Sequence, residues 1–219
     1  MRVAKGLRVA PSQVELSLGR GGNRKLPLKV GNHGTQPLHA RLTVHNLDGT
    51  DADWILLQPN DFTLASARGR NVLVMARPGS EVKEHRYGFL RVSVDSDGDA
   101  SQTRDLPLAL LAATSTKPSI DTGSVVWQAD GDRPAFVLPV TNRGTVHLPL
   151  NGRLTISNGL GQKMEVTGGF NRWLLPGQEG EIRFSMQHAL AASTYAVKIE
   201  IQTGEGFEPL TISQQVKVD

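Results

Sequence analysis

The sequence predicts an all-β protein built from two tandem immunoglobulin-like antiparallel β-sandwich domains, residues 1–116 and 117–219. Three observations support this fold class. Apolar and polar residues alternate in short runs, which is the period of a half-buried strand. Turn residues separate these runs at intervals of about 8 to 12 residues, the spacing expected of an antiparallel sandwich. The chain also repeats itself after about 110 residues, which is the length of one such domain.

The repeat has several landmarks in one order. They are Asn-x-Gly-Thr at 32–35 and 142–145, Arg-Leu-Thr-Val/Ile at 41–44 and 153–156, and a tyrosine before an alternating run at Tyr87 and Tyr195. The separations are 110, 112 and 108 residues. A unit of this length is too long for a solenoid repeat and fits duplication of a whole domain. The small, polar segment 112–118 ends in Pro118 and is the expected boundary.

The predicted strands follow from the alternation. In the first half they include 14–18, 26–30, 42–44, 72–74 and 89–94, the last with a change of phase between Arg91 and Val92. In the second half they include 136–140, 154–156, 182–184, 197–201 and 212–218. The only helical signal is weak and lies at 187–192, within a connection between strands.

Composition excludes several classes of protein. The chain has no cysteine, which rules out disulfides, thiolate metal sites and cysteine nucleophiles. The formal net charge is only +3, although the first domain holds 15 Lys/Arg against 11 Asp/Glu and the second holds nine against ten. Such a balance lacks the clustered basic footprint of a nucleic-acid binder. The basic segment 19–25 is therefore interpreted as a glycine-rich hairpin turn rather than a phosphate or RNA contact.

No run approaches the roughly 18 consecutive apolar residues of a membrane-spanning helix, so we expect no membrane insertion. Neither end has the layout of a signal peptide. Met1 is compatible with a native start or with a chain from which a leader has been removed.

Catalytic and metal-binding motifs are missing from the sequence. It contains no nucleophile elbow, phosphate-binding loop or His-Glu-x-x-His, so we expect neither an enzyme nor a cofactor. Asp95, Asp97 and Asp99 resemble the opening of a calcium loop, but Ala100 and Leu106 occupy the positions that need glycine and glutamate. A polar hairpin loop is the preferred interpretation. His39 and His45 belong to the solvent face of one strand.

Several segments of the first domain resemble those of a known family. The stretch 7–16, the Val-x-Asn-x-Gly turn at 30–34, the segment 54–64 and Tyr87 leading into Leu90-x-Val92 together resemble the first domain of the periplasmic chaperones of pilus assembly. The resemblance covers nearly all of residues 6–118. The second half is similar only to a generic secreted sandwich domain.

The resemblance implies a non-enzymatic protein of the periplasm, or otherwise outside the cytoplasm, that lends an edge strand to a pilin-like subunit and also has a possible contact with an usher. The strand would be 106–111, with Leu106, Leu108 and Leu110 on one face. Arg8 and Lys117 would hold the subunit's terminal carboxylate. Ordinary burial of the three leucines is the alternative, and Pro107 removes one amide from the strand.

A second functional hypothesis belongs to another class. Two tandem sandwiches also suit a structural or adhesive surface module, in which no strand is donated. The sequence leaves both hypotheses open.

Overall fold

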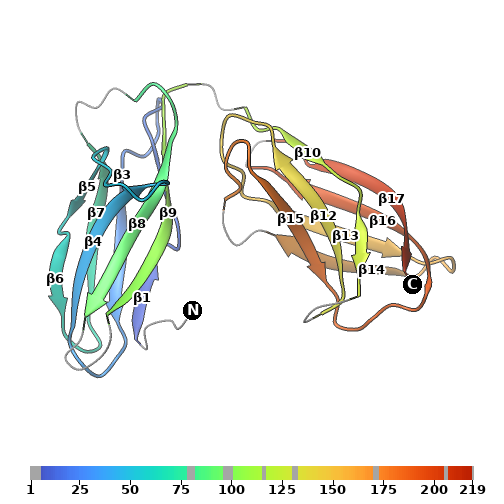
Figure 1. Ribbon diagram of the computed structural model, residues 1–219, viewed down its shortest axis with the longest axis horizontal. Coiled ribbons are helices and arrows are strands. Elements are labelled where there is room, and N and C mark those ends of the chain that lie inside the picture. The colour runs from blue at the N-terminus through green and yellow to red at the C-terminus, as the bar shows by residue number, and fades with distance from the viewer. Residues whose placement is uncertain are drawn as a thin grey trace. The chain divides into compact units, whose positions relative to one another are not determined.

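The computed structural model describes residues 6–77, 82–95, 101–114, 117–129, 133–169, 173–204 and 207–218. The chain divides into two compact units, Met1–Ser115 and Thr116–Asp219. Each unit is an immunoglobulin-like β-sandwich, and all regular structure in the described ranges is β-strand (Figure 1). Within those ranges no helix is long and apolar enough to cross a membrane.

The described residues of the first unit form nine strands in two sheets. One sheet has the order β1-β3-β7-β5 and the other has the order β2-β9-β8-β4-β6. The bounds are β1 Leu7–Ala10, β2 Val14–Ser17, β3 Lys25–Asn32, β4 Leu38–Asn46, β5 Ile55–Gln58, β6 Asp61–Leu64, β7 Gly69–Ala76, β8 Arg86–Asp95 and β9 Gln102–Leu111.

The second unit repeats the two-layer plan. One sheet has the order β14-β13-β16-β17; in the other, β12 pairs with β10, β11 and β15. The bounds are β10 Ile120–Thr122, β11 Val126–Gln128, β12 Ala135–Asn142, β13 Asn151–Ser157, β14 Lys163–Gly169, β15 Glu179–Ser185, β16 Ser193–Gln202 and β17 Leu210–Val218.

Each unit has its own core, made of the inward-facing residues of the alternating strands. Leu28, Leu42, Val72 and Leu90 are among those of the first unit. Leu138, Leu154, Ile182 and Ile199 are among those of the second. The alternation predicted from the sequence therefore buries one face of each sheet, because successive side chains of a strand point to opposite faces.

The repeated Asn-x-Gly-Thr motif has the same role in both units. Asn32 is 1% exposed, and its amide donates to the carbonyl oxygens of Gln36 and Leu64 while its Oδ1 accepts from the Gly34 N–H. Asn142 is fully buried and makes the matching bonds to Val146, Leu174 and Gly144. These bonds fix the loop after each strand to a segment farther along the same unit, the end of β6 at Leu64 in the first and Leu174 in the second.

Two sequence predictions need correction. There is no change of phase in β8, since Leu90, Val92 and Val94 all face the core and Phe89 lies on the outer face with Arg91. The outward Phe89 ring stacks on His45 at 5.2 Å between centroids, and the Arg91 guanidinium lies 5.0 Å from its centroid. This packing gives an aromatic ring a partner outside the core.

The second correction concerns segment 19–25, which is not a hairpin turn. It joins β2 to β3, and these strands belong to different sheets because β2 pairs with β9. The segment 187–192, where a helical turn was conceivable, is an irregular connection.

Candidate partner-binding edge

Strand β9 is covered along only part of its outer side. On its inner side it pairs antiparallel with β8 over nine residues, from Gln102 to Leu110. On its outer side β2 pairs with it in parallel, but only from Leu108 to Leu111. Residues 102–107 therefore have no strand partner on this side among the described residues, and we call them the open edge of β9. At about 3.3 Å per residue the open edge is roughly 20 Å long.

The direction of the backbone groups on β9 follows from one bond. The Leu18 N–H donates to the Leu111 carbonyl oxygen at 2.9 Å, so the Leu111 carbonyl faces the β2 side. Backbone groups alternate from one side of a strand to the other. Thr103 and Asp105 therefore direct their N–H and C=O groups toward the open side, whereas Pro107, with the same direction, has no N–H to offer there.

The side chains of the three leucines in the proposed donor strand point into the first unit. Leu106 and Leu108 are 1% exposed and Leu110 is 0% exposed, and all three belong to the core of the first unit. The structure thus has the burial that the sequence left open as the alternative. Side chains in this position stabilise the unit itself.

The outward residues of the open edge are polar. Thr103 and Asp105 are exposed. The Asp105 carboxylate accepts two hydrogen bonds from the Arg91 guanidinium, at 2.9 and 3.0 Å, and this bond raises the pKa of Arg91. The bidentate pair links β9 to β8 on the surface and holds the Asp105 side chain over the sheet rather than over the edge.

Arg8 lies at the end of the first unit where β9 begins. It is exposed on β1, opposite Gly31, one residue from Asn32. The Asn32 amide bonds to the Leu64 carbonyl oxygen, and Leu64 pairs with Leu38 at the start of β4. The next residue of β4, His39, pairs with Asp95, the last residue of β8 before the β8–β9 loop.

The open edge and Arg8 also lie on the same flank of the sandwich. The chain passes directly from β1, which pairs with β3 in one sheet, to β2, which pairs with β9 in the other. Both β1 and β2 are therefore border strands of this flank. A strand added at the open edge would extend the sheet that contains β9, whereas Arg8 lies on β1 in the facing sheet.

Lys117 belongs to the second unit and is exposed. Its backbone N–H donates to Thr145 Oγ1 at 3.1 Å, and its carbonyl oxygen accepts from the Thr145 N–H at 3.0 Å. Thr145 is the last residue of the second Asn-x-Gly-Thr motif, so the main chain at Lys117 is fixed by the repeat itself. Its ammonium group takes no part in these bonds.

The acidic loop falls largely outside the described residues. Asp97 and Asp99 lie in segment 96–100, about which the structure says nothing, and Asp95 is exposed at the end of β8. Within the described ranges no group of three or more His, Cys, Asp or Glu side chains could hold a metal ion.

Comparison with solved structures shows that this fold is similar to the fold of chaperones of pilus assembly. The YadV chaperone aligns with a TM-score of 0.55 at 11% identity, covering 96% of this chain and 99% of the other. The periplasmic chaperone SfaE aligns at 0.53 and 11% identity, covering 97% and 98%.

A third structure, of the Salmonella enterica SafA pilin in complex with the SafB chaperone, aligns at 0.53 and 15% identity, covering 98% and 99%. At these identities the chain is similar to the chaperones in fold, across both of its units. By sequence alone, no protein-family model and no curated protein matches it.

Proposed function

We propose that this chain is a non-enzymatic chaperone for pilus or fimbrial subunits that acts in the periplasm, or otherwise outside the cytoplasm. In this proposal a subunit adds a strand to the open edge of β9, by β-augmentation. The observation that carries it is that no strand in the described part of the chain pairs with the outer side of residues 102–107, in a chain whose fold is similar to that of pilus chaperones.

An uncovered strand edge presents unpaired N–H and C=O groups, which most proteins cover or interrupt. Here the four groups of Thr103 and Asp105 point to the open side. A net value of about 1 kcal/mol for each hydrogen bond gives about 4 kcal/mol for a fully paired edge. Pro107 ends the run of donors, so the register of an added strand is restricted to the first part of the edge.

Arg8 supplies the proposed anchor. Arg8 is exposed on β1, a border strand of the facing sheet, at the end of the unit where β9 begins, and its side chain alternates with the buried Leu7 and Val9. A carboxylate at one end of a partner strand is a suitable ligand, because a guanidinium binds carboxylates through two parallel hydrogen bonds. Lys117, six residues after the last residue of β9, is a separate proposed contact with the subunit.

The test uses Thr103→Pro, which removes one outward N–H while leaving the ladder to β8 in place. The matched control is Thr103→Val, which keeps the N–H and the β-branched shape and loses only the hydroxyl. Each variant is co-expressed in the periplasm with a tagged pilin subunit, and the co-purified amount is measured. We expect Thr103→Val to retain the subunit and Thr103→Pro to lose most of it.

Arg8→Ala should lower the recovery of the subunit independently of the edge. Equal recovery with the proline variant and the valine control would contradict strand addition at this edge and favour the structural-module hypothesis. Circular dichroism of the isolated variants checks that both remain folded.

A further inference from the structure

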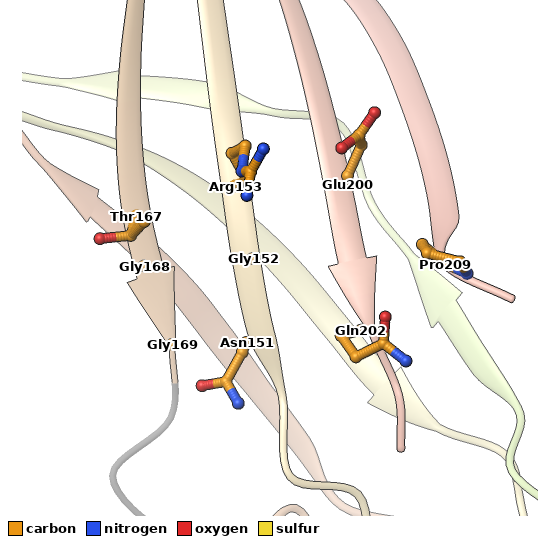
Figure 2. Close-up of a pocket in the computed structure, with 9 residues that line it drawn as sticks. All are labelled: Asn151, Gly152, Arg153, Thr167, Gly168, Gly169, Glu200, Gln202 and Pro209. Carbon is orange, nitrogen blue, oxygen red and sulfur yellow. The ribbon is translucent and has the colours of Figure 1, made fainter. Parts of the chain in front are cut away.

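The second unit carries a polar groove on the outer face of the sheet β14-β13-β16-β17. The groove has a volume of about 690 Å³, which is within the usual range for ligand-binding pockets. Figure 2 shows that its side chains come from neighbouring strands, with Thr167 on β14, Arg153 on β13 and Glu200 on β16. The lining residues are Asn151, Gly152, Arg153, Thr167, Gly168, Gly169, Glu200, Gln202 and Pro209.

Two glycines explain why the sheet is hollowed here. A Cβ atom on Gly152 would lie 2.8 Å from Cζ of Phe184, and one on Gly168 would lie 2.6 Å from the carbonyl oxygen of Arg183. A side chain at either position would therefore point into the core, next to the fully buried Phe184. Because neither has a side chain, the backbone of β13 and β14 lies close to Phe184 and β15, and the outward side chains on either side stand above it.

The side chains of the groove form two rows across the sheet. Arg153 pairs with Thr167 on one side and Glu200 on the other, and Asn151 pairs with Gly169 and Gln202. Neighbouring groups within a row are about 4.8 Å apart, and the rows are about 7 Å apart along the strands. Hydrogen-bonding groups are therefore spread over a shallow surface rather than focused on one point.

The groups offer both donors and acceptors. The Glu200 carboxylate accepts a 2.6 Å bond from Lys198 Nζ, which lowers the pKa of Glu200 together with the charge of Lys198 and, more weakly, that of Arg153. The Gln202 amide nitrogen donates to the carbonyl oxygens of Gly204 and Phe207, and its Oε1 is an acceptor. Asn151, Arg153 and Thr167 add an amide, a guanidinium and a hydroxyl.

We propose that this groove binds a neutral saccharide. A sugar presents hydroxyl groups that donate and accept, and the mixed rim of Arg153, Glu200, Asn151 and Gln202 meets both needs. The charges of Arg153 and Glu200 oppose each other, which does not favour a polyanion. No aromatic side chain is among the lining residues, so a stacked nucleobase is not favoured. The ring of Pro209 supplies an apolar contact for the C–H face of a sugar.

The test is an NMR titration of the whole ¹⁵N-labelled chain with three neutral probes, maltotriose, chitotriose and mannotriose. Saturable shifts at the amides of Asn151, Arg153 and Gln202 with at least one probe are expected. Arg153→Met should weaken that binding about tenfold, the loss expected for one hydrogen bond to a charged group. Thr155→Ala, one row farther along β13, is the matched control and should leave the affinity unchanged.

The chain is also titrated with inorganic phosphate. If no trisaccharide gives saturable shifts, the proposal is overturned. Saturable shifts with phosphate but with none of the sugars would overturn it as well, since Arg153 would then act as a simple anion contact. The readout does not involve any pilus subunit, so it is independent of the proposed chaperone function.

Discussion

Replacement of Asn142 by alanine tests whether the repeated motif holds the second unit together. The substitution removes three hydrogen bonds, to the carbonyl oxygens of Val146 and Leu174 at 2.9 and 2.8 Å and from the Gly144 N–H at 2.8 Å. At about 1 kcal/mol for each bond the loss is about 3 kcal/mol, and the backbone groups left without a partner add to it. A loss of this size is a large fraction of the stability of a small domain.

The assay is urea unfolding followed by tryptophan fluorescence. Trp173 reports on the second unit, because it precedes Leu174 and is buried against His147 at 4.1 Å between ring centroids. Trp54, buried in the first unit, reports on the other transition, which should not move. Asn151→Ala is the matched control because Asn151 is exposed. A loss below about 0.5 kcal/mol for Asn142→Ala, within the range of an ordinary surface substitution, would refute this reasoning.

The remaining predictions concern β9 and the polar groove. Leu108→Ala should lower the free energy of unfolding of the first unit by about 2 to 5 kcal/mol, as for a core leucine. An unchanged urea midpoint would show that Leu108 does not serve the core. Lys198→Ala should raise the pKa of Glu200 toward its ordinary value, measured by ¹³C NMR of the carboxyl group. In the parent chain the folded-state pKa is the lower one, so the Glu200 contribution to stability is present above the unfolded-state pKa and is lost as the pH falls through the folded-state value. An unchanged titration would contradict the bond from Lys198 Nζ.

Much of the fold could be predicted from the residues themselves. A period of two gives the face that each side chain occupies, and it correctly buries residues such as Leu28, Val72 and Leu154. The repeated Asn-x-Gly-Thr marked two positions whose buried asparagines make equivalent bonds in the structure. Such a motif is informative because a buried amide needs fixed partners wherever it recurs.

The candidate edge could not be predicted in the same way. The period of β9 shows that Leu106, Leu108 and Leu110 share a face, but it does not show whether that face meets the unit's own core or a partner. The alternation also does not show which strand lies next to β9. The parallel pairing with β2 ends at Leu108 and leaves residues 102–107 without a partner strand among the described residues, and no feature of these residues predicts where it ends. Pro107 was the one useful sign, since it can occupy only a position whose missing N–H faces away from the ladder.

Phe89 was misplaced for a related reason. An aromatic residue in an alternating strand predicts burial on grounds of hydrophobicity, but the ring is on the outer face between His45 and Arg91. The ring contacts His45 on β4 and Arg91, which lies two residues farther along β8. A contact with another strand cannot be predicted from the alternation within one strand. The sequence alone therefore suggested a break in β8 that the structure does not have.

The most direct test of strand addition is amide hydrogen exchange at Thr103 and Asp105, with and without a purified pilin subunit. In the free chain both amides should exchange rapidly, because they face the open side, while the amides of Leu106 and Leu108, directed toward β8, are protected. In the complex the amides of Thr103 and Asp105 should become protected. Protection already present in the free chain, or rapid exchange that persists in a saturated complex, would contradict strand addition at the open edge of β9.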